Sequence, residues 1–224
     1  MSLDDRYEIK INMKIIIILI VIYSTQLAFA AQKGPAYVID ASGVVKINNK
    51  MVELGRPLKI GDQIEIPGSA GTLSGKFDHF YFKITGGELS LVKSRAKKKV
   101  QHYAFTQKTG KVFYYIPKTN VKWGFQIKTD FGRVQIIQEK QMEDAEVVLD
   151  IFKTYCFIRV YAGKVRLKYG SRKKTVTAAP KNKELKFEKK FTNPKQDEIA
   201  QAVSSKDKMI FKQLKEYAKS ITAN

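Results

Sequence analysis

Strict alternation of apolar and polar residues is the feature that most restricts how this chain folds. In Lys164-Val-Arg-Leu-Lys-Tyr169 every second residue is apolar, and residues 125–129 and 156–160 alternate in the same way. A period of two places one face of a β-strand against a core and the other face in water. Turn signals containing Gly or Pro recur at short spacing, and no helical period interrupts the pattern ahead of residue 193. The sequence therefore predicts an all-β domain.

A glycine opens five of the predicted strands in the pattern Gly-x-(Val/Leu)-x-apolar. These glycines are Gly43, Gly87, Gly110, Gly132 and Gly163. Glycine supplies a positive φ at a turn, and the third and fifth residues of the pattern then share the inward face. Two spacings, 23 and 22 residues, are nearly equal, and the first, 44, is twice as long. The pattern fits a β-sandwich or roll, with a short β-solenoid as the alternative.

The C-terminal part, residues 191–224, changes to helical spacing. Asn193 is placed to cap a helix whose first residue is Pro194. Apolar residues then recur three or four residues apart, at Ile199, Val203, Ile210, Leu214, Tyr217 and Ile221. This predicts one or two amphipathic helices, with a break at Ser204-Ser205. We expect the helical segment to pack across the β domain; the alternative is that it binds a partner.

Residues 13–31 have the three parts of a secretory signal peptide. Lys14 precedes the apolar run 15–22, and a more polar stretch leads to Ala28-Phe29-Ala30. The unbroken run is short beside the roughly 20 apolar residues of a spanning helix. We expect residues 1–30 to be removed as a signal peptide, with 1–12 a mis-assigned start. Residues 31–190 then form a periplasmic or secreted β domain with no stable membrane span; the alternative is an uncleaved anchor.

The scarcity of cysteine and histidine excludes several kinds of site. Cys156 is the single cysteine, so an internal disulfide framework, a CxxC redox pair and a four-cysteine zinc site are excluded. His79 and His102 are the two histidines, which leaves little for a zinc enzyme. We expect Cys156 to be a buried thiol in a strand. These residues predict a protein that holds no metal and no cofactor.

The acidic residues show no catalytic pairing. Glu143, Asp144 and Glu146 are interpreted as part of a loop leading into the next strand, and not as a glycosidase pair. Asp62 follows Gly61, and we expect its carboxylate to hold that tight turn through bonds to the backbone. The sequence therefore predicts that the chain is not an enzyme.

The chain is strongly basic. Its formal net charge is +20, from 41 Lys plus Arg against 21 Asp plus Glu. A basic exported protein attracts anionic polymers or lipid headgroups, by an interaction that salt weakens. Lys outnumbers Arg, which indicates a diffuse surface; the alternative is a solvated strand face without a ligand. Nucleic acid is disfavoured by export. A possible anionic-partner patch comprises Arg95, Lys97, Lys98, Lys99, Lys164, Arg166, Lys168, Arg172, Lys173 and Lys174.

Four segments occur in an order that a known family shares. Gly43-Val-Val-Lys-Ile47 precedes Leu58-Lys-Ile-Gly-Asp-Gln-Ile64, which has the form L-x-x-G-D-x-I. Phe125-Gln-Ile-Lys-Thr-Asp-Phe-Gly-Arg-Val134 and Cys156-Phe-Ile-Arg-Val-Tyr-Ala-Gly-Lys-Val165 follow. In this order the segments resemble the FecR family, over residues 37–169. The chain departs from it at residues 134–138, Val-Gln-Ile-Ile-Gln, where the family commonly has V-R-G-T.

The resemblance implies a FecR-like β domain that binds something. In well-known members this domain receives a signal from an outer-membrane transporter and passes it to a cytoplasmic sigma-factor-binding segment. We expect here a non-catalytic exported FecR-like binding module of the bacterial cell envelope, which mediates protein or envelope-polymer interactions. Two alternatives stay open: a membrane-anchored signal-transducing regulator of the FecR type, and a basic adhesin for anionic cell-wall polymer or lipopolysaccharide.

Overall fold

The structure is a computed structural model that describes residues 36–69, 71–97, 100–118, 122–137, 144–169, 172–177, 183–188 and 204–222. The predicted signal peptide and the predicted cap at Asn193 lie outside these ranges. The strands are β1 (Ala36–Gly43), β2 (Lys46–Ile47), β3 (Lys50–Met51), β4 (Gln63–Ile66), β5 (Gly71–Phe77), β6 (Phe80–Lys97), β7 (Val100–Ile116), β8 (Lys122–Thr129), β9 (Gly132–Ile137), β10 (Ala145–Ile151), β11 (Tyr155–Ala162), β12 (Lys164–Tyr169), β13 (Arg172–Thr177) and β14 (Lys183–Glu188). The helix is α2 (Ser205–Thr222). Within these ranges, no helix combines the length and the apolar character that crossing a bilayer requires.

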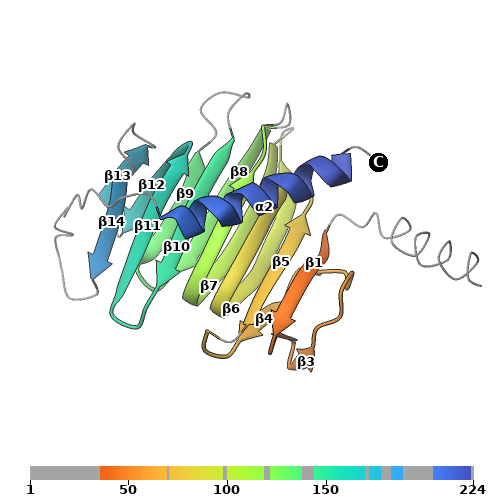
Figure 1. Ribbon diagram of the computed structural model, residues 1–224. Helices are drawn as coiled ribbons and strands as arrows, with labels where there is room; N and C mark the ends of the chain where they lie inside the picture. The colour runs from red at the N-terminus through yellow and green to blue at the C-terminus, as the bar shows by residue number, and fades with distance from the viewer. Residues whose placement is uncertain are drawn as a thin grey trace, which may run out of the picture. The chain divides into compact units, whose positions relative to one another are not determined.

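All of these strands belong to one sheet, which is folded into two layers by the long strands β6 and β7. Residues 80–85 of β6 pair with β5, whereas residues 87–90 pair with β4. Residues 100–106 of β7 pair with β8 in parallel, whereas residues 110–116 pair with β10. Layer A therefore contains β1, β5, β10, β11 and β14, and layer B contains β2, β3, β4, β8, β9, β12 and β13 (Figure 1). The two long strands run through both layers.

Glycines lie where the long strands pass from one layer to the other. Gly87 and Gly110 have φ angles of +95° and +83°, which side chains rarely adopt. A Cβ atom at Gly87 would overlap the carbonyl oxygen of Thr109, and one at Gly110 would overlap that of Gly86. The positive φ expected for these glycines is confirmed. The expectation that a glycine opens a strand is wrong for Gly43, which ends β1, and for Gly87 and Gly110, which lie inside continuous strands at the bend.

The core fills the space between the layers and is rich in aromatic rings. Phe125 of β8 lies 4.8 Å from Phe80 of β6 and 5.2 Å from Phe105 of β7, measured between ring centroids. Tyr114 is fully buried and donates its hydroxyl hydrogen to Oε1 of buried Gln107, at 3.1 Å. Edge-to-face and stacked rings each add to the stability that burial gives. The inward residues predicted after Gly87, Gly110 and the other glycines are buried wherever their burial is described.

Helix α2 covers the outer face of layer A (Figure 1). Its apolar stripe, Ile210, Phe211, Leu214 and Ala218, packs on Tyr81, Phe113, Tyr115 and Val148. Ser204 caps the helix, since its Oγ accepts the N–H of Asp207 at 3.3 Å. Layer A therefore has both faces covered, whereas no described helix covers layer B. The expected packing of a C-terminal amphipathic helix across the β domain is confirmed.

The fold class predicted from the sequence, all-β with a C-terminal helical segment, is confirmed. The solenoid alternative required stacked parallel rungs. Among the strands that the structure describes, β7 and β8 form the one parallel pair, and the other pairs are antiparallel. The near-equal glycine spacings therefore do not reflect rungs.

Candidate functional site

Three of the predicted patch residues share one face of β12. Lys164, Arg166 and Lys168 are partly exposed on the outer side of layer B, whereas Val165 between them is fully buried. This is the arrangement that the alternation predicted, with cations in water and apolar residues in the core. Lys164 also takes part in another side-chain interaction, so it is not a free cation.

The remaining described patch residues fall in two places, because those of β13 lie beside β12 whereas those of β6 do not. Arg95 and Lys97 lie at the end of β6, where their Cα partners on β7 are His102 and Val100. In the sheet order this strand is four positions from β12. Lys98 and Lys99 lie outside the described residues. On β13, Lys173 is the Cα partner of Lys168, whereas Arg172 and Lys174 pair with Tyr169 and Leu167.

Two residues that the sequence analysis missed complete a row of cations on layer B. Lys128 of β8 is the Cα partner of Arg133 of β9, and Arg133 is the partner of Lys168 of β12. We call Lys128, Arg133 and Lys168 the cationic row. The short turn after Thr129 was the available signal, because closing a hairpin there pairs Lys128 with Arg133.

The turn between β8 and β9 fixes this register. Thr129 Oγ1 donates to the carbonyl oxygen of Gly132 at 3.0 Å and accepts the N–H of Phe131 at 3.1 Å. Phe131 is buried in the core, which anchors the turn from the other side. Asp130, in the same turn, is exposed. The spacing between the cations of the row is therefore set by rigid backbone.

The cationic row carries an electrostatic cost. Directly opposed residues on neighbouring strands lie about 4.5–5.5 Å apart, and like charges in such pairs destabilise a sheet. Lys128 and Arg133 are both exposed, so water and salt reduce the repulsion without removing it. A bound anion removes the repulsion and makes favourable contacts at the same time. The row is therefore suited to hold negative charges that are spaced about one strand apart, about 4.8 Å.

Amide side chains lie next to the cationic row. Gln126 and Gln135 are Cα partners, and Gln135 is also the partner of Arg166. This second row is two residues further along each strand, about 6.6 Å away. Amide and guanidinium groups donate hydrogen bonds to hydroxyl and acidic oxygens. The outer face of layer B thus combines positive charge with hydrogen-bond donors.

The other singled-out residues have structural partners. The Asp62 carboxylate accepts the backbone N–H of Lys59 at 2.8 Å and Nδ2 of Asn48 at 2.7 Å, which confirms its role in holding the turn. Cys156 is buried in β11, as expected, and burial raises the pKa of its thiol to about 12. A thiol that keeps its proton is a poor nucleophile.

The acidic stretch is used for packing. Asp144 Oδ1 accepts the N–H of Lys118 at 2.8 Å, and its Oδ2 accepts the hydroxyl hydrogen of Tyr115 at 3.2 Å. Glu146 forms a 2.5 Å ion pair with Lys215 of α2. Glu146 lies within β10, so the loop interpretation is wrong for this residue; Glu143 lies outside the described ranges.

The described ranges contain no group of three or more His, Cys, Asp and Glu side chains that is placed to hold a metal ion. His79 lies 3.3 Å from the Asp78 carboxylate in the turn between β5 and β6, and His102 is exposed on β7.

Comparisons with known proteins find resemblance in structure and none in sequence. No protein-family model matches the chain, and no curated protein sequence matches it. One similar solved structure, of a candidate anti-sigma factor from Parabacteroides distasonis, is 11% identical with a TM-score of 0.44, covering 59% of this chain and 57% of the other. A second, also described as a candidate anti-sigma factor from that organism, is 10% identical with a TM-score of 0.35, covering 71% and 56%. The chain thus spans little more than half the length of either.

Proposed function

We propose that this chain is a non-catalytic binding module, exported to the bacterial cell envelope, which holds a linear anionic polymer across the outer face of layer B. The observation that carries this proposal is the cationic row of Lys128, Arg133 and Lys168. Three rigidly spaced cations on three neighbouring strands repel one another, and a bound anionic polymer relieves this repulsion. The net charge of +20 adds a long-range attraction for the same ligands.

The cationic row determines how a bound polymer is oriented on the sheet. Because its three cations lie on different strands, a chain of anions that contacts all of them runs across the strands. Gln126, Gln135 and Arg166 then lie along one side of the polymer and donate hydrogen bonds to it. Binding of this type releases counterions, so the affinity falls as salt rises. For a flexible polyanion, the logarithm of the binding constant falls by about 0.7 per neutralised charge for each tenfold rise in salt concentration.

The test is a variant in which Lys128, Arg133 and Lys168 are all changed to Gln. Its matched control changes the exposed Lys50, Lys59 and Lys212 to Gln, which removes the same charge from other surfaces. Binding of both to polyphosphate and to lipoteichoic acid is measured between 50 and 300 mM salt. We expect the row variant to lose at least tenfold in affinity and to show a shallower salt dependence, with less than a threefold loss in the control. Equal losses in both would show that the attraction is diffuse and that the row is not a site.

Export is tested separately. We expect the chain purified from its native envelope to begin at Ala31, which N-terminal sequencing determines. An intact N-terminus retained in salt-washed membranes would favour instead a membrane-anchored regulator of the FecR type.

A further inference from the structure

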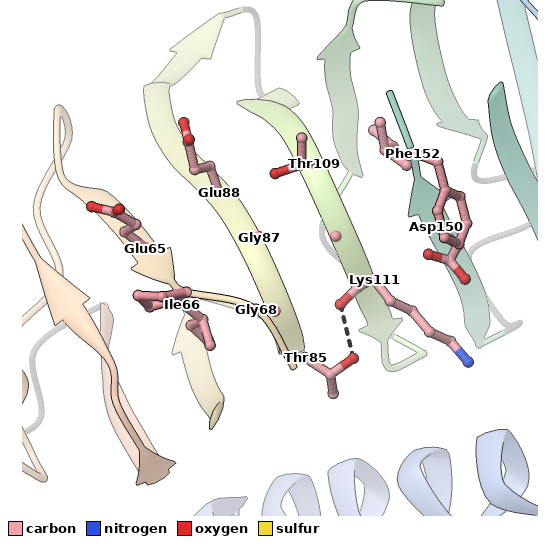
Figure 2. A pocket seen from close by; sticks show the side chains of 14 residues that line it. Glu65, Ile66, Gly68, Thr85, Gly87, Glu88, Thr109, Lys111, Asp150 and Phe152 are labelled. Atoms are coloured by element: carbon pink, nitrogen blue, oxygen red, sulfur yellow. Dashed lines mark hydrogen bonds between the residues drawn. The ribbon is translucent and has the colours of Figure 1, made fainter. Parts of the chain in front are cut away.

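A groove lies where β6 and β7 bend from one layer to the other. It has a volume of about 530 Å³ and crosses β4, β6, β7 and β10. Figure 2 shows Glu65 and Glu88 on neighbouring strands on one side, and Asp150 and Phe152 on the other. We call this the glycine groove, because Gly68, Gly86, Gly87 and Gly110 line it.

The floor of the glycine groove is bare backbone. Gly86, Gly87 and Gly110 are required by the bend, since a Cβ atom at any of them would overlap a backbone carbonyl oxygen. Gly68 differs, because a Cβ atom there would meet nothing within 4 Å, so this position faces open space. Backbone without side chains allows a flat ligand to approach closely.

One end of the groove has an aromatic wall. Phe152 follows β10 in the hairpin that leads to β11, and its side chain is 40% exposed. Its ring stacks on Tyr155, with centroids 4.5 Å apart and planes 25° apart. The N–H of Phe152 donates to the carbonyl oxygen of Tyr155 at 2.9 Å, which closes the hairpin. The ring is therefore held in place while part of its surface faces solvent.

The other end of the groove is acidic. Glu65 of β4 and Glu88 of β6 are Cα partners, so two acidic residues occupy neighbouring positions on the outer face. Lys108 forms a 2.9 Å ion pair with Glu88. Thr85 and Thr109 add hydroxyl groups along the floor. Ionised carboxylates only accept hydrogen bonds, so this end suits a ligand that donates them.

We propose that the glycine groove binds a short, uncharged glycan. Sugar rings pack an apolar face on an aromatic side chain, and their hydroxyl groups donate strong hydrogen bonds to carboxylates. An anionic ligand is disfavoured because the lining contains three carboxylates, Glu65, Glu88 and Asp150, and one cation, Lys111. An extended peptide that adds to a sheet needs a free edge, whereas β6 and β7 are paired on both sides. The groove and the cationic row use different residues, so this inference does not rest on the proposed function.

The test is titration of the full chain with cellotetraose, maltotetraose and tetra-N-acetylchitotetraose by calorimetry. We expect at least one to bind with a dissociation constant of about 1 mM or lower. Phe152→Ala removes the aromatic wall and should weaken binding at least tenfold. Gly68→Asn should do the same, because Asn tolerates the φ of +63° at this position and its side chain extends into the groove.

Matched variants separate the groove from the rest of the surface. Gly61 also has a positive φ and open space at its Cβ position but does not line the groove, so Gly61→Asn should bind as the wild type does. Met209→Ala removes an apolar side chain that is 64% exposed on α2, and it should also leave binding unchanged. Far-UV circular dichroism shows whether each variant is folded.

Two results would overturn the inference: no binding of any of the three glycans at 10 mM, or binding that Phe152→Ala and Gly68→Asn leave unchanged. The variant that lacks the cationic row should bind the uncharged glycan normally. Loss of polyanion binding alone, or of glycan binding alone, therefore identifies which of the two proposals fails.

Discussion

Asp207 holds the beginning of α2 on layer A, and replacing it measures how much this attachment contributes to the stability of the protein. Its side chain is fully buried, at 0% exposure. Oδ1 accepts a hydrogen bond from Lys111 Nζ at 2.6 Å, and Oδ2 accepts one from the Tyr161 hydroxyl at 2.8 Å. Arg159 lies 3.8 Å from Oδ2. Asp207→Ala removes the one carboxylate that joins these three groups to the helix.

The magnitude follows from the exposure of the groups left behind. Removing one partner of a buried ion pair costs about 3–5 kcal/mol, because the other charge stays buried without compensation. Lys111 and Arg159 keep 25% and 19% exposure, so water reaches both in part. We therefore expect Asp207→Ala to lower the free energy of unfolding by about 3 kcal/mol, at the lower end of that range.

Urea unfolding measures this loss with two probes. The single tryptophan, Trp123, is buried in the core and reports on the layers, while circular dichroism at 222 nm reports on α2. Glu216→Ala, on the exposed side of α2, serves as the control and should change stability by less than about 0.5 kcal/mol. In the double variant with Lys111→Met the two losses should be less than additive. A loss below about 1 kcal/mol for Asp207→Ala would refute the reasoning, since it would mean that the carboxylate contributes no more than an exposed one.

Two further predictions concern a thiol and a turn. Burial raises the pKa of Cys156 to about 12, above its ordinary 9.0, so the native protein keeps a proton that the unfolded chain releases between these values. The free energy of unfolding should then fall as pH rises from 9 to 12, by about 1.4 kcal/mol per pH unit for this group. A Cys156→Ala variant should lack this part of the pH dependence. Modification of the native protein by a thiol reagent at pH 8 would contradict the burial of the thiol. Asp62→Ala removes the acceptor for Lys59 and Asn48, and it should lower the free energy of unfolding, measured in urea, by about 2 kcal/mol. The control Glu53→Ala, at an exposed position, should leave the stability unchanged. Equal stability of the two variants would show that the turn does not need the carboxylate.

Local patterns predicted the strands well, because burial follows directly from alternation. Leu89, Val112 and Val134 each come two residues after a glycine of the repeat, and each is buried. The helix was predicted for the same reason, since Ile210 and Leu214 lie on the stripe that packs on layer A. Asp62 and Cys156 were also interpreted correctly, because each depends on near neighbours in the chain or on the burial of its own strand.

Features that depend on distant pairing were not predictable from one sequence. The sequence around Gly87 and Gly110 has the pattern of two strand beginnings. Only the pairing of β6 and β7 with different partners shows that each strand continues through the bend. The cationic row joins Lys128 with Lys168, residues forty positions apart, through the register of β9. Asp207 has the pattern of a helix start, and nothing near it in sequence indicates Lys111 as its partner.

The strands β6 and β7 belong to both layers, which ties the two layers into one cooperative unit. β6 pairs with β5 in one layer and with β4 in the other, and β7 pairs with β10 and with β8, so removing this hairpin would take central strands from both layers. The hairpin that they form brings residues of both layers together over a short stretch of sequence, and such local contacts form early in folding. We therefore expect this hairpin to form early in folding and to be among the last parts of the described structure to separate when the protein unfolds.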